Sequence, residues 1–240
     1  MKILIVGDTH ADKTYMGLVH ATALRTKVDR VVQVGDFGFF PKHFIWPPQE
    51  YSEDIDLHWI DGNHDDHDSI AKGVLPDGCT YHPRGSIEEV GGLTFLYLGG
   101  AHSIDQHRRR EGVDWWPGEN ITNDDIKEAL SHNVSVDVIV THDCPDFVPI
   151  GSVAKNQWLI ENGFDITPRG NRTKLRLLWE KYKPKLWYFG HWHQDFRYIK
   201  HTEYPNGTEF VCLSGSTAST KTAVVLDTET LEEQTVTLMR

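Results

Sequence analysis

Five short runs of mostly apolar residues divide the chain, and polar residues follow each of them directly. The runs are residues 2–6, 30–34, 56–60, 136–140 and 186–189. Runs of this length that alternate with longer helical patterns are typical of buried strands in a parallel sheet. Helices are predicted at residues 17–27 and 173–183, and Pro184 ends the second one. The alternation of strand and helix predicts an α/β fold.

Two other regions have the pattern of antiparallel strands. In residues 79–98 polar and apolar positions alternate, with turn residues at 83–85 and 91–92, which predicts a small meander. Residues 196–239 alternate in the same way around a turn at 205–207. We therefore expect antiparallel strands beside the parallel ones.

The remaining segments complete the predicted organisation. A helix is predicted at residues 122–132, with Thr122 as N-cap and Asp125 three residues later. Prolines and aromatic residues at 39–48 predict a loop. No linker or repeat interrupts the pattern, so we expect one domain over residues 1–240, with two sheets face to face and helices outside.

Composition and charge narrow the class of protein. The 240 residues include 35 acidic and 24 basic ones, a formal net charge of -11, which argues against a protein that wraps long nucleic acid. A small anionic substrate remains compatible, because bound divalent cations can reverse the local sign of an acidic pocket. The 3 cysteines are far apart and odd in number, which indicates a reducing compartment. No stretch approaches the roughly 20 apolar residues that span a bilayer, so we expect a cytoplasmic protein with no membrane partner.

The polar residues after the five runs are types that bind metal ions. They form the segments Gly7-Asp8-Thr9-His10, Gly35-Asp36, Gly62-Asn63-His64-Asp65, Thr141-His142 and Gly190-His191-Trp192-His193. Residues two apart in an extended chain point the same way, so Asp8 and His10 can reach one ion, as can His191 and His193. Ligands bind at the carboxyl ends of strands in open α/β sheets. The five segments together predict a site for a pair of metal ions.

Each segment taken alone has a simpler explanation. A Gly-Asp pair after a strand is usually a turn or a helix cap, and a lone His-x-His pair is more often solvated or structural. The 14 histidines of the chain prove little by number. Only the recurrence of such residues at five successive strand ends favours the metal site.

The order Asp-x-His, Gly-Asp, Gly-Asn-His-Asp, His and Gly-His-x-His across residues 7–193 resembles the calcineurin-like metallophosphoesterases. The resemblance implies a four-layer α-β-β-α sandwich, in which two mixed sheets pack face to face inside outer helices. It also implies two divalent metal ions with two sets of ligands. The first set is Asp8, His10 and His193, the second is Asn63, His142 and His191, and Asp36 bridges them.

The same resemblance implies the chemistry. Two cations clamp the phosphate and activate a water, while His64 meets the leaving-group oxygen as general acid. The nitrogen and oxygen ligands favour Mn²⁺, with Fe, Zn²⁺, Co²⁺ or Ni²⁺ as alternatives. The family usually has a second acid three residues after the Gly-Asp aspartate, which orients the histidine. Phe39 stands there, so Asp65, Asp66 or Asp68 would have to replace that acid.

A glycine-rich segment with a basic triplet, residues 99–110, supplies candidates for substrate binding. We expect His102, Asp105, Arg108 and Arg109 to recognise an anion, and Trp115 to stack on a base. A solvated charge run and core packing explain these features equally well. The segment is similar to one in phage-encoded members of the family, including mycobacteriophage enzymes that act on cyclic nucleotides, which would place the protein in the host cytoplasm.

These features favour a metal-dependent phosphodiesterase for small phosphodiesters, with 2′,3′-cyclic nucleotides as the preferred substrate. A phosphomonoesterase or a nuclease of the same fold is the alternative, and the sequence shows no basic groove for a nuclease. A non-catalytic interaction protein is disfavoured, because no expected ligand is missing. The oligomeric state does not follow from the sequence.

Overall fold

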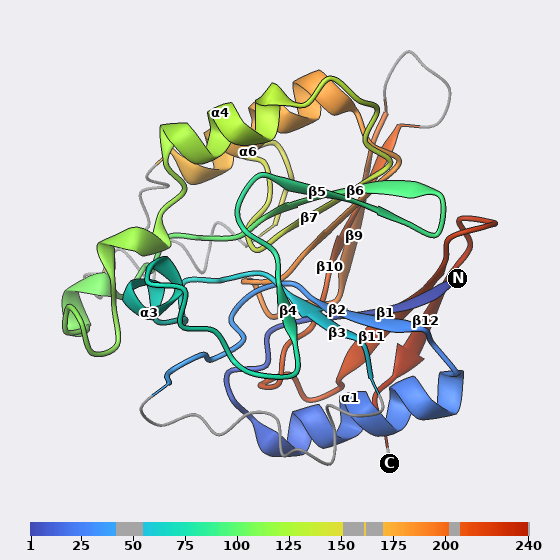
Figure 1. The fold of residues 1–240 in the computed structure, drawn as a ribbon, viewed down its shortest axis with the longest axis horizontal. Helices are drawn as coiled ribbons and strands as arrows, with labels where there is room; N and C mark the ends of the chain where they lie inside the picture. The colour runs from blue at the N-terminus through green and yellow to red at the C-terminus, as the bar shows by residue number, and fades with distance from the viewer. Residues whose placement is uncertain (42–54, 151–160, 162–169, 202–206, 240) are drawn as a thin grey trace.

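A computed structural model describes residues 1–41, 55–150, 161, 170–201 and 207–239. Two sheets lie at its centre (Figure 1). The first contains β1 (Lys2–Val6), β2 (Arg30–Gln33), β3 (Leu57–Trp59), β4 (Thr80–Tyr81), β11 (Thr222–Asp227) and β12 (Glu233–Thr237). The second contains β5 (Ser86–Val90), β6 (Leu93–Leu98), β7 (Val138–Thr141), β8 (Leu186–Phe189), β9 (Phe196–Lys200) and β10 (Thr208–Cys212).

Both sheets are mixed. The order in the first is β12-β11-β1-β2-β3-β4, and β1 to β4 are parallel while β11 and β12 are antiparallel to their neighbours. The order in the second is β5-β6-β7-β8-β10-β9, with β6, β7, β8 and β10 parallel. The strands β5 and β9 form antiparallel edges. The parallel strands of each sheet therefore present their carboxyl ends at one edge.

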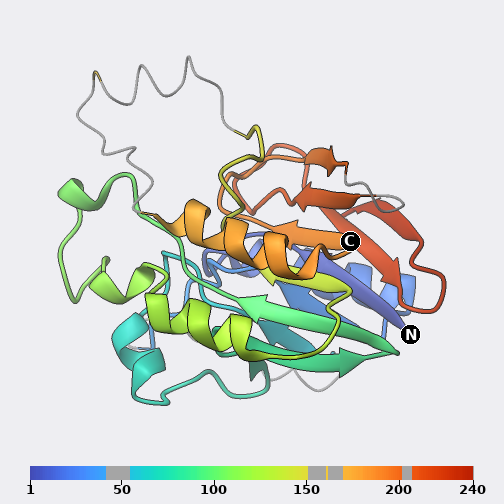
Figure 2. The ribbon, with the colours of Figure 1, turned by 90° about the horizontal axis from the view of Figure 1, so that it is seen from above.

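Helices cover the outer face of each sheet. They are α1 (Lys13–Thr26), α3 (His67–Ala71), α4 (Asn123–Ser131) and α6 (Asn171–Tyr182), with short 3₁₀ turns η1 (Gln106–Arg108) and η2 (Pro117–Glu119). The helix α1 lies under the first sheet, whereas α4 and α6 lie side by side over the second (Figures 1 and 2). This is the α-β-β-α sandwich that the resemblance predicts.

Alternation along the strands builds three core layers. On β1, Ile3 and Ile5 point into the core between the sheets, while Leu4 and Val6 pack towards α1. On β8, Trp187 and Phe189 pack towards the helices over the second sheet. A strand covered on both faces has to be apolar throughout, which is why these runs stand out in the sequence.

The structure corrects the predicted meander. Residues 80–81 form β4, which pairs in parallel with β3 in the first sheet, and only β5 and β6 form the predicted antiparallel hairpin. Alternating polarity indicates a strand covered on one side, but it carries no information about which strand is the partner.

In the C-terminal region the predicted antiparallel pairing is confirmed for β9 with β10 and for β11 with β12. The sequence did not indicate that β10 also pairs in parallel with β8, or that β11 and β12 belong to the first sheet. The predicted turn at 205–207 lies outside the described residues apart from Gly207, as do residues 42–48 of the predicted loop.

The first helix begins earlier than predicted, at Lys13, because the Asp12 side chain accepts hydrogen bonds from the backbone N–H groups of Thr14 and Tyr15. The predicted helices at 122–132 and 173–183 are confirmed to within two residues as α4 and α6. Within the described part of the chain, no helix has the length and apolar character needed to cross a membrane.

Candidate metal centre

Residues that follow five parallel strands meet between the two sheets. Asp8, Asp36 and Asn63 follow β1, β2 and β3 of the first sheet. His142 and His191 follow β7 and β8 of the second. The chain topology thus brings together the seven residues that the sequence predicts as ligands.

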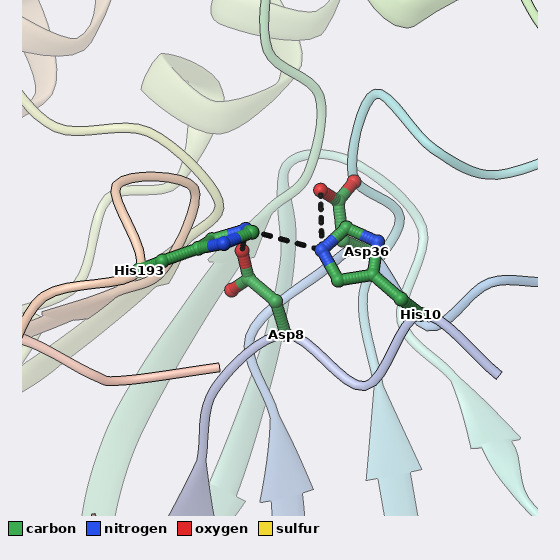
Figure 3. Close-up of side chains that lie close together, drawn as sticks. All are labelled: Asp8, His10, Asp36 and His193. Carbon is green, nitrogen blue, oxygen red and sulfur yellow. Dashed lines mark hydrogen bonds and ion pairs between the residues drawn. The ribbon is translucent and has the colours of Figure 1, made fainter. Parts of the chain in front are cut away.

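A first group contains Asp8, His10, Asp36 and His193, whose ligand atoms all lie within 4.8 Å of one another. Figure 3 shows these side chains pointing toward a common centre. The Nε2 atom of His193 is 3.0 Å from Asp8 Oδ2 and 3.1 Å from His10 Nε2. His10 Nε2 is 3.7 Å from Asp36 Oδ2. Two carboxylates and two imidazoles therefore surround one point.

A second group contains Asp36, His142 and His191, again within 4.8 Å. The Nε2 atom of His142 is 3.2 Å from Asp36 Oδ1 and 3.3 Å from Asn63 Oδ1. The two oxygens of Asp36 therefore face different groups: Oδ2 faces the first and Oδ1 faces the second.

The donor atoms of the second group fit a cation. His142 Nδ1 is 2.9 Å from the Val34 carbonyl oxygen, which can only accept, so this nitrogen carries the proton. In a neutral ring, the Nε2 lone pair then faces the oxygens of Asp36 and Asn63. Burial alone would lower the pKa of His142, but the charge and hydrogen bond of Asp36 raise it to about 10. A positive charge is needed at this point, and a divalent ion can supply it as well as a proton.

Contacts outside the two groups fix their orientation. His193 Nδ1 is 2.7 Å from Thr217 Oγ1. The Asn63 amide Nδ2 donates to Ser103 Oγ at 3.0 Å, and the Ser103 hydroxyl donates to Glu119 Oε2 at 2.6 Å. Sequence reasoning identified neither Thr217 nor Ser103 as part of the site. Ser103 is 40 residues from Asn63, so no local pattern could have linked them.

The backbone is strained where the ligands are. Eight non-glycine residues in the described chain have positive φ, and four of them are predicted ligands. These are His10, Asp36, His191 and His193, with φ of 47°, 53°, 65° and 51°. Left-handed backbone at such residues costs of order 1–3 kcal/mol each and clusters at functional sites.

Two glycines are required because side-chain atoms of metal ligands lie where a Cβ atom would be. A Cβ atom on Gly190 would lie 2.0 Å from Asp8 Oδ1, and one on Gly62 would lie 2.2 Å from Asp36 Oδ1. Neither glycine has positive φ, so the turn itself does not demand them. Any side chain there would enter the space between the ligands.

His64 lies beside the first group. Its ring packs edge-on against that of His10 with centroids 5.0 Å apart, and its backbone N–H donates to Asp36 Oδ1 at 2.7 Å. The Arg109 guanidinium approaches both ring nitrogens, at 3.0 and 2.8 Å. Arginine can only donate and a neutral imidazole has a single accepting nitrogen, so one of the two contacts is a hydrogen bond to a neutral ring. Burial lowers the pKa of His64 to about 4, and the charge of Arg109 acts in the same direction.

The acids suggested as replacements for the position of Phe39 have other partners. The Asp65 carboxylate accepts hydrogen bonds from the backbone N–H groups of Phe37, Phe39 and Gly62. Asp66 caps α3 through Ser69, and Asp68 is exposed. Phe39 itself packs on Trp59 in the core.

The structure separates the predicted substrate residues. Arg109 Nε donates to Asp105 Oδ1 at 2.7 Å, so this pair stands together beside His64. Arg108 is exposed and its Nε lies 3.3 Å from a nitrogen of the neighbouring His107. His102 is buried with Nδ1 3.7 Å from Glu119 Oε1, and Trp115 is half-buried. Only Asp105 and Arg109 are placed by these contacts at His64.

The α-β-β-α sandwich thus gathers carboxylates and imidazoles after the parallel strands of both sheets, in an arrangement that can hold metal ions. The sequence model of the calcineurin-like phosphoesterases matches residues 1–195, and the chain belongs to this family. The protein is therefore an enzyme that hydrolyses phosphate esters.

Solved structures agree on the fold. One, described as a novel archaeal phosphodiesterase, is 15% identical with a TM-score of 0.50, and the alignment covers 99% of this chain and 100% of that one. Another, the protein TT1561 of Thermus thermophilus, is 11% identical with a TM-score of 0.58, covering 99% of each chain. No curated protein matches the chain by sequence.

Proposed function

We propose that the protein is a phosphodiesterase for small phosphodiesters that works with two divalent ions. The observation that carries this proposal is the position of Asp36, whose two carboxylate oxygens face two separate groups of donors. A carboxylate shared in this way is what a two-metal site requires.

The proposed ligands divide between the two ions. The first ion is held by Asp8, His10, Asp36 and His193, and the second by Asp36, Asn63, His142 and His191. We favour Mn²⁺, with Fe, Zn²⁺, Co²⁺ or Ni²⁺ as alternatives, because imidazole and carboxylate donors suit these ions. When bound, the pair supplies Lewis acidity to the phosphate oxygens and lowers the pKa of a nucleophilic water.

Two side chains beside the metal ligands, Arg109 and His64, bind the phosphate and the leaving group. Arg109 presents its guanidinium at the edge of the first group, held there by Asp105. It donates to a non-bridging phosphate oxygen and leaves His64 when it does so. His64 then directs a ring N–H toward the leaving-group oxygen. Proton transfer by His64 stays a prediction.

The substrate is proposed to be a cyclic nucleotide, with 2′,3′-cyclic ones favoured. Support comes from Arg109 beside the metal ligands and from the half-buried Trp115, 6 residues further along the chain, whose ring offers a stacking face. We place the activity in a single domain over residues 1–240 and in the cytoplasm. Three free cysteines fit a reducing compartment. Similarity to phage-encoded enzymes stays a prediction.

A substrate panel tests the proposal. Hydrolysis of bis(p-nitrophenyl) phosphate, p-nitrophenyl phosphate, 2′,3′-cyclic and 3′,5′-cyclic nucleotides and single-stranded DNA is measured with each divalent metal. We expect the highest kcat/KM on a cyclic or simple diester with Mn²⁺. A higher value on the monoester or on DNA would show that the enzyme is a phosphomonoesterase or a nuclease instead.

Variants beside the metals test the residue roles. His64→Ala is expected to lower kcat for diester hydrolysis by about 100-fold or more, because the leaving oxygen loses its donor. Arg109→Ala should raise KM more than Arg109→Lys, which keeps the positive charge. Arg108→Ala, one residue away and exposed, is the control and should leave KM unchanged. Equal rates for His64→Ala and wild type would contradict the assignment.

A further inference from the structure

A second cluster of imidazole and carboxylate side chains lies apart from the metal centre. It consists of His58 on β3, His82 just after β4, and Glu88 on β5. Their ligand atoms lie within 4.8 Å of one another, and they share no residue with the centre. The cluster therefore needs an explanation that does not involve phosphate ester hydrolysis.

Strand alternation places this cluster between the two sheets. Leu57 and Trp59 pack towards α1, so His58 between them faces the second sheet. The His82 ring stacks on Tyr97 of β6, with centroids 3.7 Å apart and planes 11° apart. His58 is 4% and His82 7% exposed. The two imidazoles are thus fixed in the core where β3 and β4 meet β5 and β6.

The nitrogen atoms of the two histidines face each other. His58 Nδ1 is 2.7 Å from His82 Nε2, and His82 Nε2 is 3.7 Å from Glu88 Oε2. His58 Nε2 is 2.9 Å from Asp56 Oδ1 and so carries its proton there. The Nδ1 atom is then left with a lone pair. A carboxylate on the far nitrogen of an imidazole is the usual outer contact of a histidine that binds metal.

We propose that His58 Nδ1, His82 Nε2 and Glu88 Oε2 form a binding site for a single Zn²⁺ ion. His82 binds through Nε2 as a neutral imidazole, and the proton that this nitrogen shares with His58 Nδ1 moves to His82 Nδ1. Water fills the fourth position on the side of Glu88, whose side chain is 30% exposed. Tetrahedral Zn²⁺ with bonds of about 2.0–2.1 Å holds its nitrogens roughly 3.3 Å apart. The two nitrogens, 2.7 Å apart, need to separate by only about 0.6 Å.

The charge around the cluster permits a dication. Arg30 donates to Glu88 Oε1 at 2.8 Å and to Asp56 Oδ2 at 2.7 Å, so the other oxygen of each carboxylate faces the cluster. Glu88 Oε2 also accepts from the Tyr97 hydroxyl at 3.4 Å, which leaves it a second lone pair for an ion. Two carboxylates and one guanidinium sum to one negative charge. Both imidazoles are neutral, since burial lowers the pKa of His58 and lowers that of His82 to about 4. Neutral imidazole is the form that binds metal.

Such an ion would join the two sheets, because its ligands come from β3 and the residue after β4 on one side and from β5 on the other. Its role would be to hold the sandwich together at this edge. The site does not depend on the proposed phosphodiesterase activity, so each can fail without the other.

Zinc content of the complete chain tests the site. Wild type, His82→Gln and His201→Gln are equilibrated with the same excess of Zn²⁺, freed of unbound metal, and analysed for ions per chain. We expect His82→Gln to hold one ion fewer than wild type while retaining diester hydrolysis. His201→Gln, which removes an exposed histidine, should match wild type. Equal zinc content in folded His82→Gln and wild type would overturn the proposal.

A second variant covers the case in which His82→Gln does not fold. Glu88→Gln keeps an oxygen for Arg30 and loses only the charge. It should bind the additional Zn²⁺ about 10-fold or more weakly, as measured by titration against a competing chelator, and Asp56→Asn should weaken it through His58 in the same direction. Unchanged affinity in both variants would show that the histidines form only a hydrogen-bonded pair.

Discussion

The side-chain amide of Asn63 has nearly the same shape in its two orientations, so its neighbours decide which atom faces His142. Ser103 Oγ lies 3.0 Å from the amide nitrogen, and the hydroxyl proton of Ser103 is engaged by Glu119 at 2.6 Å. Ser103 Oγ can therefore only accept from Asn63, which turns the amide oxygen toward the metal centre. Ser103 and Glu119 thus act on the proposed second ion through the orientation of Asn63.

Loss of this contact should weaken metal binding without unfolding the protein. Ser103→Ala leaves the amide free to turn its nitrogen inward, and Glu119→Gln lets the hydroxyl of Ser103 compete as a donor. Each is expected to lower the affinity for one of two Mn²⁺ ions by about 10- to 100-fold in calorimetric titration. Ser86→Ala, at a buried hydroxyl on β5 that makes no hydrogen bond among the described residues, is the matched control. Identical titrations for Ser103→Ala and Ser86→Ala would contradict this role.

Residues next to strand ends could be predicted, and their partners from other loops could not. Asp8 and His191 stand directly after Gly7 and Gly190 at the ends of β1 and β8, so the local pattern locates both. The partner of His64 could not be found this way, because Arg109 reaches it from 45 residues away. The position of Phe39 indicated only that the usual acid was missing.

At the scale of elements, the sequence predicts what a segment is better than what it pairs with. Residues 186–189 form β8 with the predicted bounds, and Thr122 and Asp125 form the predicted cap of α4. Residues 80–81, predicted as part of an antiparallel meander, form β4 and pair in parallel with β3. Its backbone is fixed by pairing with β3 and by a hydrogen bond from His82 N–H to the Trp59 carbonyl oxygen at 2.9 Å. Such contacts are not encoded in the polarity of residues 79–98.

The cap of α4 gives a prediction at this scale. Thr122 Oγ1 accepts from Asp125 N–H at 3.0 Å, and Asp125 Oδ2 accepts from Thr122 N–H at 2.7 Å. Thr122→Ala removes one half of this box and should lower the free energy of unfolding by about 1 kcal/mol in urea denaturation. Diester hydrolysis should not change. The neighbouring exposed Asn123→Ala is the control, and a larger loss in Asn123→Ala would refute the capping role.

Buried ionisable groups act in opposite directions on the stability of the whole molecule. Burial raises the pKa of Asp65 from its ordinary 3.8 to about 7. The neutral carboxyl therefore stabilises the folded state fully below the unfolded pKa, and this contribution is lost as pH rises toward 7. Burial lowers the pKa of His82 to about 4, against about 6.5 in the unfolded chain, so its neutral form stabilises the fold above about pH 6.5. The two effects oppose each other over the same pH range, so the pH dependence of the unfolding free energy of wild type does not report on either group. The difference in unfolding free energy between wild type and a variant of one group does.

The stability of His82→Gln relative to wild type should therefore depend on pH in metal-free buffer. Between about pH 6.5 and 4 the unfolded wild type takes up a proton on His82 that the folded protein does not, and glutamine abolishes this uptake. As pH falls through this range, the unfolding free energy of wild type should therefore fall relative to that of His82→Gln by on the order of 1–3 kcal/mol. Urea denaturation with EDTA at several pH values measures it. A pH-independent difference would show that His82 is not held neutral.

Metal binding should stabilise the whole molecule, because the proposed ligands come from both sheets and are apart in the unfolded chain. An ion that binds only the folded state adds about 2.7 kcal/mol when its free concentration is 100 times its Kd. Two ions should therefore add roughly 5 kcal/mol, lost on addition of EDTA and measured by urea denaturation with and without Mn²⁺.

Because Asp36 belongs to both groups, variants should lose different shares of the stabilisation by Mn²⁺. His191→Ala touches only the second group and should remove about half of the Mn²⁺ effect, whereas Asp36→Asn disturbs both groups and should remove most of it. Asp68→Asn, an exposed acid outside both groups, should keep all of it. If Asp36→Asn and His191→Ala lose equal amounts, one ion accounts for the whole effect. The two oxygens of Asp36 would then not join two sites, and the proposed mechanism would have to work with a single metal.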